Sequence, residues 1–300
     1  MVRVGTSGYV YGDWKGIFYP KGLPACDWLK YYASKFDTVE LNGTFYRLPP
    51  EGCAERWRDA VPEGFSFAAK GSRFLTHMKK LKDPLAGLGR YYERSGGLRP
   101  KLSVVLWQLP PMMSRPDLPR LDAFLAAQPK DLRHAVEFRG EAWYTPEVCD
   151  LLDKHGAAFC EHDLVAKAPP RFTGGFRYVR FHGSEPLKLK YHGRYGRERL
   201  KPWAEDLSSW AGDAYVYFNN DWHGAAIFDA LDLLDLLRRK DESGGVSRSR
   251  RRSAGGRPRA EARGGYGRRG QDHGQRHLRD RSSLRARLAV GAQRGHDPRP

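Results

Sequence analysis

The sequence predicts a (β/α)8 barrel of the TIM type, followed by a disordered tail rich in Arg and Gly. Eight short β-rich runs recur along the first 240 residues, and segments with helical spacing separate most of them. A chain of about 250 residues is the usual size of such a barrel. After Lys240 the composition changes to Gly, Arg and Ser. We therefore assign residues 1–240 to the barrel domain and residues 241–300 to the tail.

The predicted strands are runs in which β-branched and aromatic residues are concentrated. They are Val2–Ser7, Thr38–Thr44, Phe65–Lys70, Leu102–Leu109, His134–Arg139, Ala157–Asp163, Arg177–Gly183 and Tyr215–Asn220. Because a helical segment follows most of them, we expect parallel strands, as in a barrel. A doubly wound open sheet is the alternative, although no G-x-G-x-x-G pattern follows the first strand.

The predicted helices are segments in which apolar residues recur at helical spacing. They are Trp28–Lys35, Glu51–Ala60, Leu118–Ala127, Pro146–His155, Leu200–Trp210 and Gly224–Arg239. The last is the clearest, and its predicted apolar face comprises Ile227, Leu231, Leu234 and Leu237. The sixth connection, Leu164–Phe176, contains paired prolines and glycines, so we predict no full helix there.

The positive charge of the chain is concentrated in its last fifth. The whole chain has 52 Lys and Arg against 35 Asp and Glu, a net charge of +17. Residues 241–300 hold 16 Arg, no Lys and 6 acidic residues, a net charge of +10 that leaves +7 for the first 240 residues. So polar a segment cannot bury enough apolar surface to fold. It is either an arm that binds nucleic acid through phosphates or an extension without function, and its lack of Lys favours the second.

Cysteine usage and hydropathy indicate a cytoplasmic protein. The four cysteines, Cys26, Cys53, Cys149 and Cys160, form no C-x-x-C pair. This argues against a disulfide scaffold and a structural zinc site and fits a reducing compartment. No apolar stretch approaches the roughly 20 residues that cross a bilayer, so we expect no membrane partner.

Alternation along the strands predicts which side chains fill the barrel. Alternate residues of a parallel barrel strand face the helices and must be apolar, and the others face the interior. In the second strand, for example, Val39 and Leu41 point outward and send Glu40 inward. The inward set predicted in this way contains Glu40, Asn42, Lys70, Gln108, Glu137, Arg139, Arg180, His182 and Asn219.

These nine side chains predict a functional site. They lie toward the C-terminal ends of their strands, the end that carries the active site in barrel enzymes. Buried charges must pair with each other or meet a polar ligand. Structural ion pairs are the alternative, formed by Glu40 with Lys70 and by Glu137 with Arg139 or Arg180. The set contains more polar groups than such pairing requires, which favours the site.

Several ordered motifs resemble those of a known family. They are Gly5-Thr6-Ser7-Gly8-Tyr9 with Trp14, Phe18-Tyr19-Pro20, Val39 to Tyr46, Phe67-Ala68-Ala69-Lys70, Thr76-His77, Gln108-Leu109-Pro110-Pro111, Glu137-Phe138-Arg139, Tyr178 to Gly183 and Val216 to Asn220. Over roughly residues 2–240 the chain is similar to the YecE-like family, domain of unknown function 72. The resemblance implies a TIM-type barrel and no particular reaction. The chain has Gly140-Glu141-Ala142-Trp143 where the family tends to have a His beside the Arg.

An anion site is the leading hypothesis for the chemistry. Lys70, Arg139 and Arg180 supply positive charge, and the Gly183-Ser184 and Asn219-Asn220 pairs would offer backbone N–H groups. Glu40, Glu137 and His182 are the candidate catalytic residues, with His182 or Glu137 as general acid or base. The predicted substrate-binding residues are Asn42, Lys70, Gln108, Arg139, Arg180, Asn219, Tyr9 and Trp14. The hypothesis is a hydrolase or lyase that acts on a small phosphorylated or carboxylated molecule.

Three alternatives stay open. A glycosidase would use Glu40 and Glu137 as its two carboxylates. A divalent metal would need a set such as Glu40, Glu137, Asp163 and His182, although no recognised ligand motif is present and we assign no metal or cofactor. A nucleic-acid-binding protein without catalytic activity would use the basic loop 188–197 and the tail.

Overall fold

Parallel strands in two sheets form the centre of the molecule. The computed structural model describes residues 1–185 and 191–252, with side chains up to Lys240. One sheet has the order β2 (Thr38–Leu41), β3 (Ser66–Lys70), β4 (Leu102–Gln108), β5 (Arg133–Glu137) and β6 (Ala157–Phe159). The other has the order β1 (Val2–Thr6), β9 (Asp213–Phe218), β8 (Phe176–Phe181) and β7 (Glu161–His162). Each predicted run overlaps a strand, and the sixth run contains both β6 and β7.

The two sheets approach each other at both of their edges. Strands β6 and β7 are separated only by Cys160, whose N–H still donates to the Val136 carbonyl at 2.9 Å. At the opposite edges, Ser7 and Glu40 form an isolated parallel bridge after β1 and in β2. The Gly8 N–H donates to the Glu40 carbonyl at 2.7 Å. The chain is therefore a mixed α/β fold in which both pairs of sheet edges are linked.

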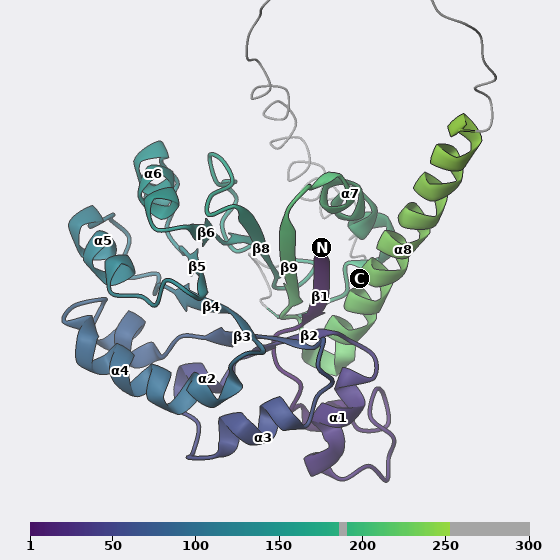
Figure 1. The fold of residues 1–300 in the computed structure, drawn as a ribbon, viewed down its shortest axis with the longest axis horizontal. Coiled ribbons are helices and arrows are strands. Elements are labelled where there is room, and N and C mark those ends of the chain that lie inside the picture. The colour runs from purple at the N-terminus through teal and green to yellow at the C-terminus, as the bar shows by residue number, and fades with distance from the viewer. Residues whose placement is uncertain (186–190, 253–300) are drawn as a thin grey trace, which may run out of the picture.

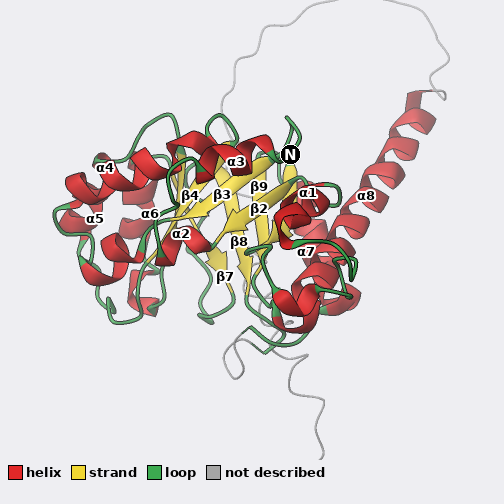
Figure 2. Cartoon of the chain, turned by 90° about the horizontal axis from the view of Figure 1, so that it is seen from below, coloured by secondary structure: helices red, strands yellow, loops and turns green. Residues whose placement is uncertain are grey.

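Helices cover the outside of the strands (Figures 1 and 2). They are α1 (Trp28–Ala33), α2 (Gly43–Tyr46), α3 (Cys53–Asp59), α4 (Pro84–Ser95), α5 (Leu118–Ala126), α6 (Pro146–Lys154), α7 (Gly196–Ser209) and α8 (Ala225–Arg252). Short 3-10 helices, and one π-helical turn at Phe74–Met78, lie in the connections. Helix α4 was not predicted. Its two glycines weaken the local helix signal, but burial of Leu88 and Tyr91 against the strands stabilises it.

Two separate apolar clusters confirm the predicted alternation of the strands. The larger one lies between strands and helices and includes Val39, Phe67, Val136, Val179 and Phe218. The smaller one is formed by the other faces of the same strands in both sheets. It consists of Ala68, Val104, Leu106, Ala135, Ala158, Cys160, Phe176, Tyr178, Tyr215 and Tyr217. The interior cluster is thus apolar along the middle of the strands, and the predicted polar side chains lie at their C-terminal ends.

Helix α8 differs from the prediction in two respects. Leu231 is 39% exposed, and Leu233 takes a fully buried place beside Ile227. The helix also continues past Lys240 to Arg252, beyond the predicted start of the tail, since a helix that is already formed adds further residues at little cost. Residues 253–300, and with them the rest of the predicted tail, lie outside the described residues. Within the described part, no helix is long and apolar enough to span a bilayer.

Candidate functional site

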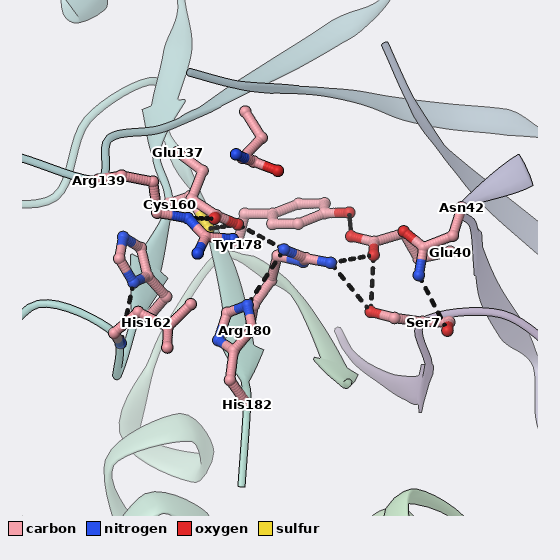
Figure 3. Close-up of polar contacts among 12 residues, drawn as sticks. Ser7, Glu40, Asn42, Glu137, Arg139, Cys160, His162, Tyr178, Arg180 and His182 are labelled. Atoms are coloured by element: carbon pink, nitrogen blue, oxygen red, sulfur yellow. Dashed lines mark hydrogen bonds and ion pairs between the residues drawn. The ribbon is translucent and has the colours of Figure 1, made fainter. Parts of the chain in front are cut away.

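A fully buried arginine joins two carboxylates at the C-terminal ends of the strands (Figure 3). Arg180 of β8 donates from Nη2 to Oε1 of Glu40 in β2 at 2.8 Å. From Nη1 it donates to Oε2 of Glu137 in β5 at 2.6 Å. All three side chains have no exposed surface. The guanidinium therefore lies between the two carboxylates and connects strands of both sheets.

Every oxygen of these two carboxylates has a donor. Glu40 accepts from the Ser7 hydroxyl and from the Tyr178 hydroxyl, each at 2.6 Å, in addition to Arg180. The second oxygen of Glu137 accepts from Nε of Arg139. Burial would raise the pKa of Glu137, but the charges of Arg139 and Arg180 outweigh it and hold that pKa well below 4.5. Glu137 is thus a fixed anion with no oxygen left for a substrate.

The imidazole of His182 is held in one neutral tautomer. Its Nε2 lies 3.2 Å from Nη1 of Arg180, and a guanidinium can only donate, so Nε2 is the acceptor. The hydrogen is then on Nδ1, which lies 2.9 Å from Oδ1 of Asp163. Burial lowers the pKa of His182 in spite of this carboxylate. Asp163 also accepts from the Tyr195 hydroxyl, which fixes the carboxylate in turn.

Three of the four backbone groups predicted to bind phosphate already have partners. The N–H of Gly183 donates to the Tyr195 hydroxyl at 2.9 Å, and that of Ser184 donates to the His192 carbonyl at 3.1 Å. After β9, the N–H of Asn219 donates to the Phe181 carbonyl at 2.7 Å. The N–H groups of Gly183, Ser184 and Asn219 are therefore already used within the fold, and a phosphate site on these pairs stays a prediction.

Lys70 at the end of β3 is the one cation among the predicted site residues that pairs with no carboxylate of the described part. The predicted pair of Glu40 with Lys70 is therefore not present, whereas the pairs of Glu137 with Arg139 and Arg180 are confirmed. The ammonium of Lys70 lies 4.3 Å from the centre of the Phe45 ring. Burial, and then the charge of Arg180, lower the pKa of Lys70 from 10.5 to about 8.

Three other predicted binding residues, Asn42, Gln108 and Asn219, have side-chain polar atoms without a hydrogen-bond partner in the described residues. Asn42 donates to the Ser7 carbonyl at 3.0 Å, but its Oδ1 is buried and has no donor in the described residues. Gln108 uses only its amide N–H₂, which donates to the Leu109 carbonyl at 3.1 Å. The side-chain amide of Asn219 has no hydrogen-bond partner in the described part of the chain. Glu40, Glu137, Arg139, Arg180 and His182 form one network, whereas Lys70, Gln108 and Asn219 lie outside its hydrogen bonds.

Tyr9 and Trp14 lie in the apolar cluster on the helix side of the strands. Trp14 is fully buried, and its indole N–H donates to the Asp221 carbonyl at 3.0 Å. The carbonyl of Tyr9 accepts from the Tyr19 hydroxyl at 2.6 Å. The structure thus shows a packing role for both side chains, and their contact with a substrate stays a prediction.

The site prediction gave no role to Ser7, Tyr178 and Tyr195. It named Asp163 only as a possible metal ligand, yet all four side chains hold the network together. Ser7 and Tyr178 complete the shell of Glu40, and Asp163 and Tyr195 orient His182. Strand alternation could have identified two of them. Val4 of β1 belongs to the helix-side cluster, which places Ser7 on the inward set, and Tyr178 is two residues before Arg180 in β8.

Two arginines of the predicted basic loop 188–197 form ion pairs with helix α8. Arg194 pairs with Asp229 and Asp232, and Arg197 pairs with Asp232 and Asp235. Lys188 and Lys190 lie outside the described residues. These ion pairs use two of the cations that the nucleic-acid hypothesis assigned to a ligand.

The geometry also bears on the other two alternatives. A glycosidase needs a sugar between its two carboxylates, but the guanidinium of Arg180 lies between Glu40 and Glu137. Among the described residues, no three His, Cys, Asp or Glu side chains are grouped closely enough to hold a metal ion. Asp163 and His182, two of the predicted metal ligands, bind each other. Neither alternative is favoured by this arrangement.

Comparisons with known proteins all point to one family. The family model described as "Protein of unknown function DUF72" matches residues 3–253. The chain is 26% identical over 270 residues to the UPF0759 protein YunF of Bacillus subtilis (strain 168), covering 79% of this chain and 95% of that protein. A DUF72 family protein of Thermotoga maritima MSB8 has a TM-score of 0.70 and 31% identity over 79% of this chain and 99% of its own. One of Enterococcus faecalis V583 has a TM-score of 0.67 and 22% identity, over 79% of this chain and 96% of its own.

Proposed function

The chain belongs to the DUF72 family, and from this premise we propose that it binds a small carboxylated or phosphorylated substrate and acts on it as a hydrolase or lyase. The site would lie at the C-terminal ends of β3, β4 and β5. Lys70, Arg139 and Gln108 would contact the substrate, with Asn42 after the neighbouring strand β2 and Asn219 after β9 of the other sheet. Nothing in the name of the family indicates a reaction, so the proposal rests on the geometry.

We further propose that the two sheets close into one (β/α)8 barrel. The bridge between Ser7 and Glu40 supports closure on one side, and the short step from β6 to β7 through Cys160 supports it on the other. An interior cluster formed by both sheets is a third support. In such a barrel, substrates bind at the C-terminal ends of the strands, where the polar network lies.

One observation carries the anion proposal, namely that the ammonium of Lys70 is nearly buried without a carboxylate partner among the described residues. The carboxylates of Glu40 and Glu137 compensate the guanidiniums of Arg139 and Arg180. Lys70 adds a further cation that is 8% exposed and lacks a described carboxylate partner. An unpaired charge in such a place costs several kcal/mol unless a counter-ion binds. A bound anion would provide that counter-ion.

The roles within the site follow from which atoms are free. Glu40, Glu137 and His182 use their polar atoms on neighbouring residues, so we assign them a positioning role through Arg180. Arg139 donates from Nε to Glu137 and keeps its terminal N–H groups, which have no partner in the described residues. Lys70 and Arg139 are thus the groups that can meet an incoming anion.

Calorimetry with the full chain tests the binding. Inorganic phosphate and lactate are titrated into the wild type, Lys70→Met and Lys35→Met. Lys35 is the matched control, because it also lies over an aromatic ring, that of Tyr31 at 5.7 Å, but is exposed and distant in the fold. We expect at least one anion to bind the wild type and Lys35→Met and not Lys70→Met. Equal binding to Lys70→Met would contradict the proposal.

The reaction class needs a separate measurement. A cell extract of small metabolites is incubated with the wild type or Lys70→Met, and the elemental compositions of the consumed substrate and its products are compared by mass spectrometry. The products of a hydrolase together contain one water more than the substrate, whereas the products of a carbon–carbon lyase together have the composition of the substrate. Absence of any metabolite that only the wild type consumes would overturn the enzymatic part of the proposal and leave anion binding.

A further inference from the structure

The surroundings of the Lys70 nitrogen differ from those of the other cations of the network. Its side chain emerges from the last residue of β3 and is 8% exposed. The ammonium lies over the face of Phe45, at 4.3 Å from the ring centre, and no described carboxylate pairs with it. The arginines and carboxylates of the network bind each other by hydrogen bonds. The Lys70 nitrogen has no carboxylate partner among the described residues and remains free to react.

We propose that Lys70 is a nucleophile that forms an imine with the carbonyl carbon of a 2-oxo acid, whose carboxylate binds Arg139. This inference rests on the anion site proposed above and narrows its substrate to carboxylates that carry a neighbouring ketone or aldehyde. It also selects the lyase of the two proposed reaction classes. A protonated imine at C2 can accept the electron pair of the bond between C3 and C4 of the 2-oxo acid as that bond breaks, which leaves an enamine on the lysine.

The first step balances without any further reactant. The neutral amine of Lys70 attacks the carbonyl carbon, and a C–N bond forms as the C=O double bond is lost. The two amine hydrogens leave with the carbonyl oxygen as one water molecule, and a C=N bond remains. Addition of water reverses these steps and releases the product from the lysine.

The surroundings of Lys70 favour the neutral amine that this step requires. Burial has the largest effect on its pKa, and the charge of Arg180 acts in the same direction, against Glu137 and Glu40. A pKa of about 8 leaves roughly one tenth of the amine neutral at pH 7, compared with about one part in three thousand for an ordinary lysine. Lys70 is therefore a reactive amine near neutral pH.

Arg139 provides the place for the substrate carboxylate. It follows β5 on the inward set, its side chain is 9% exposed, and its charge acts on Lys70. Only Nε is used, in the bond to Glu137. The terminal N–H groups are free in the described part of the chain, and a guanidinium binds carboxylates through such paired donors. A 2-oxo acid has its carbonyl next to its carboxylate, which suits two neighbouring groups of this kind.

His77 shares an aromatic neighbour with Lys70. Its ring meets the ring of Phe45 edge-on, with centroids 5.0 Å apart, and the Lys70 ammonium lies over the face of the same ring. Burial, and then the charge of Lys70, lower the pKa of His77 below 6.5. The imidazole therefore does not favour a second positive charge beside Lys70.

Trapping the imine in the wild-type full chain tests the inference. The protein is incubated at pH 7 with pyruvate as the probe and with sodium cyanoborohydride, which reduces an imine to a stable amine. Peptide mass spectrometry then compares labelling at Lys70 with labelling at Lys35 in the same sample. We expect Lys70 to be labelled on the order of tenfold faster or more, because more of its amine is neutral. Lactate, which has the carboxylate but no carbonyl, should slow this labelling.

The outcomes separate this inference from the proposed function. Labelling of Lys70 that exceeds that of Lys35 and is slowed by lactate supports both. If Lys70 is labelled no faster than Lys35, the imine is refuted, and lactate calorimetry decides the rest. Binding of lactate to the wild type but not to Lys70→Met would then retain the anion site, and no binding would refute that site as well.

Discussion

The ammonium of Lys70 lies over the ring of Phe45 at 4.3 Å from its centre, with no described carboxylate to neutralise it. A cation over an aromatic face gains about 0.5–2 kcal/mol, which only partly offsets the loss of hydration. The remaining cost is expressed in the lowered pKa of the lysine. Burial of the Lys70 ammonium over Phe45 therefore lowers the stability of the fold, and binding of an anion can recover that stability.

Lys70 should make the wild type more stable at high pH than at neutral pH, relative to Lys70→Met. Because the folded-state pKa of about 8 is below the ordinary 10.5, the unfolded chain binds more protons between these values. Stability linked to this group therefore rises with pH from about 8 to 10.5, by about 3 kcal/mol in total. Urea unfolding of both proteins across this range measures the difference. A constant difference would show that Lys70 is well solvated.

Removal of Arg180 should destabilise the fold severely. Arg180→Met leaves Glu40 and Glu137 buried without their shared cation, and breaking a buried pair in this way costs about 3–5 kcal/mol. Arg99→Met is the control, since its pair with Asp131 is exposed and such pairs contribute about 0–1 kcal/mol. Urea unfolding at pH 7 compares the two. A loss below 1 kcal/mol for Arg180→Met would mean that water reaches the network.

Acid should destabilise the protein before its carboxylates titrate. Burial is the main cause that lowers the pKa of His134 to about 4 and that of His162 to about 3. Below pH 6.5 these two histidines bind protons in the unfolded chain but not in the folded one. The free energy of unfolding therefore decreases as the pH is lowered. From pH 6.5 to 5 we expect a loss of about 1.5 kcal/mol for each.

Replacing one of these imidazoles supplies the check. His134→Gln should reduce the fall in unfolding free energy between pH 6.5 and 5, whereas His223→Gln, at an exposed position, should leave it unchanged. An identical slope for wild type and His134→Gln would show that this imidazole does not resist protonation.

The tautomer of His182 is a separate prediction. With Nδ1–H donated to Asp163 and Nε2 accepting from Arg180, the ring should be neutral at pH 6.5. Nitrogen-15 spectra of labelled protein distinguish a protonated Nδ1 from a protonated Nε2. A doubly protonated ring at pH 7 would be incompatible with the Arg180 contact.

Deletion of residues 253–300 should change the melting temperature little and leave anion binding intact. The composition of that segment predicts no contribution to a core, and the predicted site lies on β3 to β5. Thermal unfolding and lactate calorimetry of a chain that ends at Arg252 make the comparison. If the full chain also binds a DNA oligonucleotide, binding that decreases steeply with salt and disappears with the deletion would place it in the tail.

The sequence by itself determined the strands and the faces of their side chains. Alternation has a period of two residues within one strand, so Val39 and Glu40 could be assigned to opposite faces without knowledge of any neighbour. Helix α4 escaped this reasoning, because its glycines conceal a helix that only packing stabilises. The same alternation also predicted that the polar side chains face inward at the C-terminal ends of the strands.

Only the tertiary structure decided which charges meet. The sequence suggested Lys70 as a partner for Glu40, but Glu40 is bound by Arg180, Tyr178 and Ser7 from strands on the other sheet. The pairing with Arg180 and Tyr178 depends on side chains that reach across the interior from a strand more than a hundred residues away, and no local pattern encodes it. The same competition leaves Lys70 without a counter-ion, because the arginines, with more donors, occupy both carboxylates.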